Sequence, residues 1–289
     1  MSCENASAPL NLIKDTNMLE KCNIVCDYKA NYPVCRGLVK NKGSFLSITM
    51  DQCGGSVTYN KSQFKLNEVR IYQPSLHAWS GEHALGEVVL MHTRNTIVND
   101  QPDKLFVCIP FRLGSSTNSW FSFMSLIPSY YENQDSAGSA INMPGWSLNL
   151  IVPKGDYYNY QGSSPFGNCA DEVEYVVYSL EQAALINNEE YKILKSSLPV
   201  KMEIQTREWS KGRWPKLFYH SGGGEAMGDV YLDCSPINAD KHEADPKKSL
   251  KKEDSINLPM PAWEPILITG GSLIGLIILI KVWNHFRDN

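Results

Sequence analysis

The body of the chain alternates short β-rich runs with turn residues. Hydrophobic positions in these runs either follow a two-residue period or are continuous, and both patterns are typical of strands that pack on a core. The runs are SFLSITM (44–50), GSVTYN (55–60), EVRIY (68–72), EVVLMH (87–92), KLFVCIPF (104–111), WSLNLIV (146–152) and VEYVVYSL (173–180). Short strands at this spacing predict one β-dominated α+β domain.

Helical patterns are few in the same region. Residues 181–197, EQAALINNEEYKILKSS, are expected to form a helix, because their acidic start and lysine-bearing end suit the helix dipole. The pattern of residues 120–131 is ambiguous and offers a second candidate helix.

The longest apolar run lies near the end of the chain. Residues 266–280, ILITGGSLIGLIILI, carry no charge, and with their flanks the segment 262–283 reaches the length of a bilayer-spanning helix. Trp263 and Trp283 stand at its two ends, where interfacial aromatic residues belong. A buried core helix is the alternative. We expect one C-terminal transmembrane helix over 262–283, followed by a short tail, 284–289.

The stretch before this segment, residues 244–261, is charged, contains proline and lacks apolar periodicity, so it is expected to be a linker. Its lysines outnumber the basic residues after the apolar run, and this asymmetry predicts that a domain over 1–243 lies on the cytosolic side. The first residues show no signal-peptide pattern, which agrees with a single-pass, tail-anchored protein.

Charge narrows the choice of partners. Residues 1–245 contain 21 Lys and Arg against 27 Asp and Glu, so the expected domain is acidic. An acidic domain argues against nucleic-acid binding and makes glycosaminoglycan a less favoured partner, because both ligands need a basic surface.

The cysteine content indicates an oxidising final location. An even number of cysteines favours disulfides, and the eight are Cys3, Cys22, Cys26, Cys35, Cys53, Cys108, Cys169 and Cys234. Without a signal peptide, three explanations stay open: reduced cysteines, an organelle with its own import, or a large DNA virus that oxidises its virion proteins. A zinc site built from Cys22, Cys26 and Cys35 is a further alternative, although no CxxC pair supports it.

Two segments resemble the α-carbonic anhydrases. Residues 64–93, FKLNEVRIYQPSLHAWSGEHALGEVVLMHT, are similar to that family's stretch from a Phe-His-x-His strand through a Pro-Ser-Glu-His turn to a Leu-Glu-x-His-x-x-His strand. Residues 152–178, VPKGDYYNYQGSSPFGNCADEVEYVVY, resemble its Asp-Tyr-Tyr-x-Tyr-x-Gly-Ser-Leu-Thr-Thr-Pro-Pro-Cys region, and SAPLNLI (7–13) is a weaker match. The resemblance spans roughly residues 3–235 and implies a large, twisted, mostly antiparallel sheet with a few short helices.

The resemblance also implies that the zinc site has been lost. The family's three histidine ligands are replaced by Arg70, Tyr72 and Val89, and neither arginine nor valine offers a lone pair to a metal. The Glu of Pro-Ser-Glu-His is Leu76, and the Thr that orients the zinc-bound hydroxide is Pro165. We therefore expect no metal, no other cofactor and no hydration of carbon dioxide.

Other residues in the matching segments have expected structural roles. His77 and His92 are expected to be hydrogen-bonded core groups. Arg70 either binds an anion in the ancestral cleft or, as we favour, pairs with Glu68, Glu87 or another carboxylate, because an unpaired buried arginine is very costly.

A disulfide between Cys3 and Cys169 is also implied, because secreted members of the family link an N-terminal cysteine to the one after Thr-Thr-Pro-Pro. The sequence leaves open how the other cysteines connect, and these are Cys22, Cys26, Cys35, Cys53, Cys108 and Cys234.

These expectations predict a non-catalytic membrane-anchored binding or structural protein. Poxvirus envelope proteins with a carbonic-anhydrase-like domain, which bind host glycosaminoglycan, resemble the chain in their altered zinc ligands and C-terminal membrane helix. That resemblance implies a virion membrane or capsid-associated protein of a large DNA virus, with a protein partner in host attachment or virion assembly. Two alternatives remain: a cellular tail-anchored scaffold subunit of an organelle membrane complex, and a residual zinc-dependent carbonic anhydrase.

Overall fold

The computed structural model describes residues 3, 6–21, 27–51, 56–96, 98, 101–115, 119–130, 138–200 and 205–220. The chain divides into two compact units, Met1–Ser235 and Pro236–Asn289, and all described residues belong to the first. The expected linker, membrane segment and tail lie outside the described residues. No helix within the described ranges is long and apolar enough to cross a membrane.

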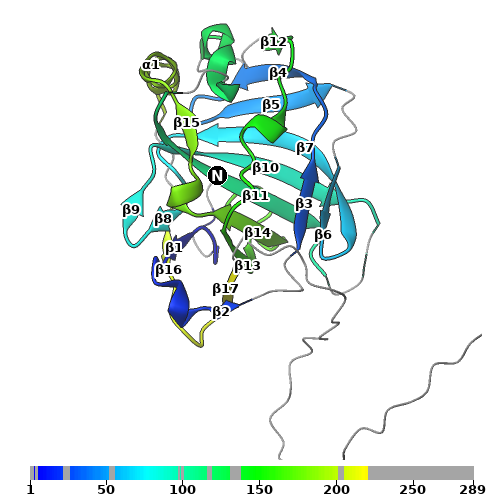
Figure 1. Ribbon diagram of the computed structural model, residues 1–289, viewed down its shortest axis with the longest axis vertical. Helices are drawn as coiled ribbons and strands as arrows, with labels where there is room; N and C mark the ends of the chain where they lie inside the picture. Colours follow the sequence, from blue (N-terminus) through cyan, green and yellow to red (C-terminus); the bar gives the residue numbers. More distant parts are fainter. Residues whose placement is uncertain are drawn as a thin grey trace, which may run out of the picture. The chain divides into compact units, whose positions relative to one another are not determined.

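Most described strands form one large sheet, which Figure 1 shows running through the first unit. In spatial order these are β12 (Ser139–Ile141), β4 (Arg36–Asn41), β5 (Leu46–Asp51), β7 (Ser62–Tyr72), β10 (Gly86–Arg94), β11 (Lys104–Leu113), β14 (Glu172–Tyr178), β13 (Tyr157–Ser163), β17 (Leu217–His220) and β2 (Glu20–Lys21). Three more strands pair beside this row: β6 (Ser56–Tyr59) with β7, β3 (Tyr28–Asn31) with β6, and β15 (Ala184–Ile186) with β11.

The large sheet is mixed. Its strand pairs are antiparallel except β11 with β14, β11 with β15 and β17 with β2, which are parallel. The expectation of a mostly antiparallel, β-dominated domain is therefore confirmed.

A small second sheet lies at one side of the large one (Figure 1) and joins β16 (Arg207–Glu208), β1 (Leu10–Leu12), β8 (Ala78–Trp79) and β9 (Glu82–His83) in that order. The helical elements of the described residues are short: the 3-10 helices η1 (Thr16–Met18), η2 (Trp120–Leu126), η3 (Leu148–Leu150) and η4 (Leu180–Gln182), and the α-helix α1 (Asn188–Ser197).

Two of the expected elements differ from the structure. The helix expected over 181–197 begins only at Asn188, because Asn187 caps it: the Asn187 side chain accepts from the Glu190 amide at 2.9 Å, and Glu190 accepts from the Asn187 amide at 3.1 Å. The residues before the cap form η4 and β15 instead. The strand expected over 146–152 is wrong, since Ser147 caps the short helix η3 there. The ambiguous 120–131 stretch contains η2.

The central strands are buried on both faces. Val88 and Leu90 of β10 belong to one hydrophobic cluster, whereas Val89 belongs to a second cluster together with Phe106 and Cys108 of β11. This double burial explains why the β11 sequence is a continuous apolar run and does not alternate.

The disulfide between Cys3 and Cys169 is confirmed, and its Cα atoms lie 5.6 Å apart. The Cys3 amide also donates to the Pro165 carbonyl at 3.1 Å, so the N-terminal segment is fixed to the loop after β13. Cys35 is disulfide-bonded as well. Cys108 is a buried free thiol. The remaining cysteines lie outside the described residues, and these are Cys22, Cys26, Cys53 and Cys234.

His92 is a hydrogen-bonded core group, as expected. Its Nδ1 lies 3.2 Å from the Leu105 carbonyl oxygen and its Nε2 lies 2.8 Å from the Tyr32 hydroxyl. Because a carbonyl only accepts, Nδ1 carries the proton and Nε2 accepts from Tyr32. Burial lowers the pKa of His92 to about 4, so the imidazole is neutral in the folded protein near pH 7.

This lowered pKa predicts a pH-dependent stability. In the unfolded chain His92 has its ordinary pKa of 6.5, whereas in the folded chain its pKa is about 4. The unfolded chain therefore binds this proton at a higher pH than the folded chain does. The free energy of unfolding should therefore fall as pH falls through this window, by about 3 kcal/mol in all. Urea unfolding at several pH values should show this loss in the wild type and a smaller one in His92→Gln. An identical loss in both proteins would contradict the assignment, and the exposed His83→Gln variant is the control.

Candidate functional site

The strand register brings together the three residues that replace the family's zinc ligands. Arg70 of β7 lies directly opposite Val89 of β10, and Tyr72 lies opposite Glu87. Directly opposed residues share a face, as do residues two apart on one strand. Arg70, Tyr72 and Val89 therefore face the same side of the sheet, among the second hydrophobic cluster.

Arg70 is held between two aromatic rings. Its guanidinium carbon lies 4.8 Å from the ring centre of Phe45 and 4.8 Å from that of Phe166. Its Nη2 forms an ion pair with Glu68 at 2.8 Å, and its Nε donates to the same carboxylate at 2.9 Å. The expected pairing of Arg70 with a carboxylate is confirmed, and the partner is Glu68. We call Arg70, Glu68, Tyr72, Phe45 and Phe166 the Arg70 cluster.

Tyr72 and Val89 lie next to Arg70 on the same face of the sheet, and each is only 1% exposed. The Tyr72 ring centre lies 5.4 Å from that of Phe45 and 6.2 Å from that of Phe166. Burial raises the pKa of Tyr72 although Arg70 opposes the rise, so the phenol is neutral. The side chains of Arg70, Phe45 and Phe166, each partly buried, pack beside Tyr72.

Leu76 and Pro165 have structural roles here. Leu76 is buried, and its amide donates to Glu87 Oε2 at 2.8 Å. Pro165 is buried and accepts the Cys3 amide through its carbonyl. Neither side chain carries a polar group that could orient a bound hydroxide.

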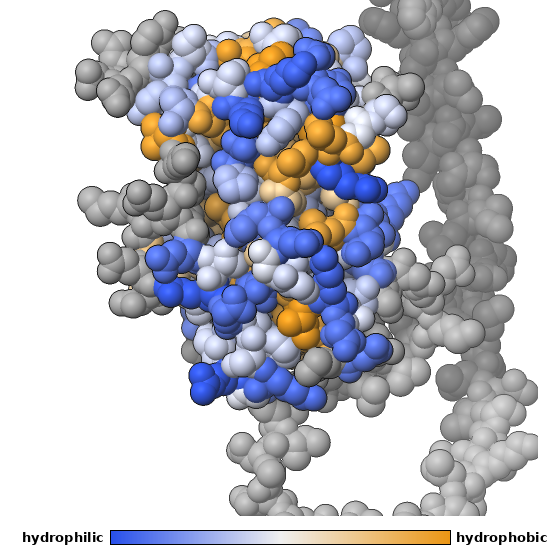
Figure 2. Space-filling view, turned by 90° about the vertical axis from the view of Figure 1, so that its left-hand side faces the viewer, coloured by the Kyte–Doolittle hydropathy of each residue, from blue (hydrophilic) through white to orange (hydrophobic). Residues whose placement is uncertain are grey.

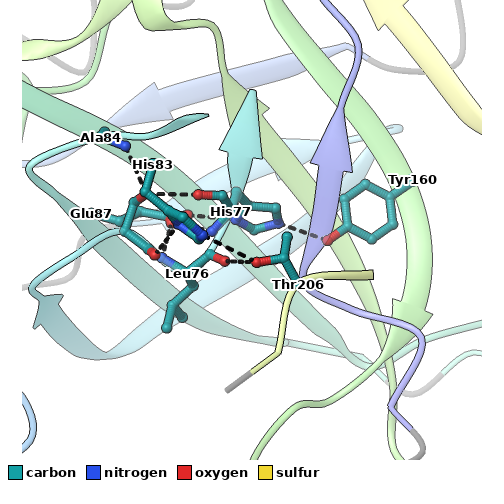
Figure 3. Close-up of polar contacts among 8 residues, drawn as sticks. Leu76, His77, His83, Ala84, Glu87, Tyr160 and Thr206 are labelled. Carbon is teal, nitrogen blue, oxygen red and sulfur yellow. Dashed lines mark hydrogen bonds and ion pairs between the residues drawn. The ribbon is translucent and has the colours of Figure 1, made fainter. Parts of the chain in front are cut away.

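Glu87, which lies opposite Tyr72 on the neighbouring strand, belongs to a buried polar network (Figure 3). His77 sits between Glu87 and Tyr160: its Nδ1 donates to Glu87 Oε1 at 2.6 Å, and its Nε2 lies 2.7 Å from the Tyr160 hydroxyl. Glu87 Oε2 also accepts the amides of Leu76 and His77, at 2.8 and 2.9 Å. His77 is thus a satisfied core histidine, as expected.

Serine 75 links this network to the surface. Ser75 donates to the His77 carbonyl at 2.6 Å and accepts the Ala84 amide at 3.0 Å, while His83 reaches Thr206 at 3.4 Å. Because the Ser75 proton is already donated to a carbonyl, the nearby His83 cannot make it a nucleophile.

One group of potential metal ligands occurs among the described residues: His77, Glu87 and Cys108. Burial alone would raise the pKa of Glu87, but the charge and hydrogen bonds of His77 outweigh it and lower the pKa. Burial and the neighbouring Glu87 raise the pKa of the Cys108 thiol, which hydrogen-bonds that carboxylate. Both His77 nitrogens and both Glu87 oxygens are already engaged, so the group is a hydrogen-bond network and not an open metal site.

Comparisons with known proteins agree on the fold. No protein-family model matches the chain. A dioscorin of Dioscorea japonica is 21% identical over 193 residues, 66% of this chain and 67% of that protein. Among solved structures, dioscorin complexed with ascorbate gives a TM-score of 0.55 at 19% identity and covers 75% of this chain and 86% of that one.

Two solved carbonic anhydrases are similar to the same degree. The α-carbonic anhydrase of Thermovibrio ammonificans, in complex with sulfanilamide, gives a TM-score of 0.56 at 18% identity, covering 74% of this chain and 86% of that one. A carbonic anhydrase of Chlamydomonas reinhardtii in complex with acetazolamide gives 0.56 at 16%, covering 75% and 91%. The chain therefore has the α-carbonic anhydrase fold.

The residues that stand at the family's zinc-ligand positions, Arg70, Tyr72 and Val89, do not fit a zinc ion. Zinc needs three or four lone-pair donors converging on one point. Arg70 has none, Val89 has no polar atom, and the neutral Tyr72 phenol is enclosed by rings. Phe45 and Phe166, which complete the filling, were not foreseen from the sequence. Phe166 lies inside one of the resembling segments, where its bulk beside Pro165 was the available signal.

The Arg70 cluster yields a stability prediction. Arg70→Ala should lower the free energy of unfolding by about 2–3 kcal/mol, because two cation–π contacts and the packed stem are lost. Arg70→Met keeps an apolar stem between the rings and should lose only about half as much. Urea unfolding measures both, and Arg112→Ala, on an exposed position of β11, should change stability by less than about 0.5 kcal/mol. If Arg70→Ala left the free energy of unfolding unchanged, the packing of Arg70 between Phe45 and Phe166 would not stabilise the fold.

Proposed function

We propose that the chain is a non-catalytic binding protein built on the α-carbonic anhydrase fold and anchored to a membrane by residues 262–283. It acts as a virion membrane or capsid-associated protein of a large DNA virus, in host attachment or virion assembly, through a protein partner. The observation that carries the non-catalytic part is the Arg70 cluster, in which a cation and three aromatic rings fill the place of a metal.

Electrostatics support this part of the proposal. Arg70 is permanently charged, and its guanidinium would repel a divalent cation placed beside Tyr72 and Val89. Without a metal, the cluster would not lower the pKa of a water molecule to near neutrality. That the fold can serve another ligand is supported by dioscorin, whose solved structure is a complex with ascorbate.

The disulfide supports a viral setting over a cytosolic one. A link between Cys3 and Cys169 needs an oxidising environment. A cellular domain facing the cytosol would keep these cysteines reduced, whereas a virus that oxidises its own virion proteins would not. The acidic charge of residues 1–245 favours a protein partner over a polyanion.

Metal content tests the non-catalytic part. Full-length protein purified in buffer with zinc should contain far less than one zinc per chain by elemental analysis, because the Arg70 cluster supplies no ligand set. Acetazolamide, which is bound in the Chlamydomonas structure, should leave the melting temperature unchanged. One zinc per chain that disappears in Tyr72→Phe would refute the proposal, and Tyr130→Phe, outside the cluster, is the matched control.

Truncation tests the anchor. Deleting residues 262–289 should yield a soluble, folded domain that no longer sediments with membranes, because the apolar span is removed. Deleting only residues 284–289 leaves that span intact and should not release the protein. Flotation on a density gradient, followed by circular dichroism, measures both effects. A truncated protein that still floats with lipid after a high-salt wash would show that the anchor lies elsewhere.

A further inference from the structure

An exposed basic loop joins β16 to β17. Its residues 210–216, SKGRWPK, contain three cations and one tryptophan, and six of the seven residues are exposed, Pro215 being the buried exception. Trp214 is 59% exposed, which is unusual for so large a side chain. Figure 1 shows this connection in yellow at the lower end of the first unit. We call residues 210–216 the basic loop.

Both ends of the basic loop are fixed to the body of the unit. Before the loop, Arg207 of β16 donates from Nε to the Ala6 carbonyl at 3.0 Å, and Trp209 packs against the second hydrophobic cluster. After it, Leu217 is 3% exposed and lies opposite Tyr160 in the large sheet. Because the base is already ordered, a ligand that binds the loop has little chain left to order.

The tip of the basic loop projects away from the unit. The Arg213 amide donates to the Ser210 carbonyl at 3.2 Å, which closes a four-residue turn. Gly212 within this turn has a φ of +79°, and a Cβ there would meet no described residue other than its chain neighbours within 4 Å. The space around the tip is therefore open. A projecting loop does not enclose a small molecule, because sites for such ligands are concave.

The cations of the basic loop are not neutralised by side chains that the structure describes. Lys211, Arg213 and Lys216 are exposed, and none of them forms an ion pair with a residue of the described ranges. Glu208, the acidic residue nearest to the loop in sequence, accepts from the Asn11 amide group at 3.0 Å. The loop is therefore a local patch of positive charge in a sequence whose residues 1–245 are acidic overall.

Cations beside an exposed tryptophan suit the surface of an anionic membrane. Each Lys or Arg close to such a surface strengthens binding about fivefold, and tryptophan prefers the boundary between headgroups and acyl chains. Three cations contribute on the order of a hundredfold, which is too little to recruit a free protein from dilute solution. It is enough for a domain that is tethered to the same membrane, because a tether keeps the loop at an effective concentration in roughly the millimolar range.

The remaining sequence and surface agree with such a contact. Residues 221–261 separate the end of β17 from the proposed anchor, and a stretch of this length is long enough to let the basic loop reach the membrane surface. The lysine asymmetry around the anchor predicts the cytosolic side, whose leaflet is the anionic one. On the face in Figure 2, hydrophobic residues form separate small patches among hydrophilic ones, so this face offers no broad apolar surface for a bilayer.

We propose that the basic loop docks the first unit onto the anionic lipid surface of the membrane that holds residues 262–283. Lys211, Arg213 and Lys216 bind anionic lipid headgroups, and the Trp214 ring enters the headgroup layer. The inference rests on the membrane anchor of the proposed function. It adds which part of the unit meets the membrane and which lipid chemistry that part recognises.

Tryptophan quenching in reconstituted vesicles tests the inference. Full-length protein is incorporated into vesicles of phosphatidylcholine, with or without phosphatidylserine, whose acyl chains are brominated or unmodified. The Trp214 signal is the difference in emission between the wild type and Trp214→Phe, because Trp263 and Trp283 are common to both proteins. Brominated lipid should remove most of this signal in vesicles with phosphatidylserine and little of it in phosphatidylcholine alone. Salt at about 1 M should restore the signal, because it screens the charges.

Charge variants show whether the loop cations are responsible, and in each variant the Trp214 signal is measured against the same variant carrying Trp214→Phe. The loop variant combines Lys211→Gln, Arg213→Gln and Lys216→Gln. The control variant removes the same charge from exposed positions elsewhere on the unit and combines Lys65→Gln, Arg112→Gln and Lys195→Gln. The loop variant should dock on the order of a hundredfold more weakly, so its Trp214 signal should no longer be quenched. The control variant should be quenched like the wild type.

Flotation of the same vesicles separates the failure of this inference from that of the anchor. If the protein floats but Trp214 is quenched equally in both lipids, or if the loop and control variants behave alike, the anchor stands and the inference is overturned. If the protein floats and Trp214 is not quenched in either lipid, the lipid assignment is overturned, and an anionic protein or glycan becomes the ligand to test. A protein that does not float refutes the anchor, and the inference falls with it.

Discussion

One partly buried cation, Arg70, determines how the side chains around it are arranged. Arg70 cannot lose its charge, so the fold must supply a counterion and polarisable surface around it. Glu68 supplies the counterion at 2.8 Å, and Phe45 and Phe166 supply the two ring faces. Arg70 and Glu68 of β7 are thereby held together with Phe45 and Phe166 from other segments, and neither Arg70 nor Val89 supplies a ligand atom for a metal.

The neighbouring polar network is satisfied by its own residues. His77, Glu87 and Tyr160 form a satisfied chain of hydrogen bonds that ties the turn after β7 to β10 and β13. Such a network stabilises only while every member is paired. No ion is needed to satisfy the Glu87 carboxylate, because it accepts hydrogen bonds from the His77 side chain and from two backbone amides.

Sequence patterns predicted the strands well because apolar periodicity and continuous apolar runs depend on burial alone. The failures have local causes. The helix expected over 181–197 is too long, because the acidic residue Glu181 suggests a helix start, whereas the side chain that caps the helix is Asn187. The hydrophobic pattern of residues 146–152 fits a strand and the short 3-10 helix at Leu148–Leu150 equally well. The Arg70 partners Phe45 and Phe166 come from segments far apart in the sequence, so only the folded chain reveals the Arg70 cluster.

Our proposal is that the Arg70 cluster takes the place of a zinc site and that the protein does not hydrate carbon dioxide. It is tested most directly by measuring carbon dioxide hydration, through ¹⁸O exchange, on the full-length protein with excess zinc. We predict exchange at the uncatalysed rate, and no change when a chelator is added. Exchange clearly faster than the uncatalysed rate, abolished by the chelator and by Tyr72→Phe, would contradict the account.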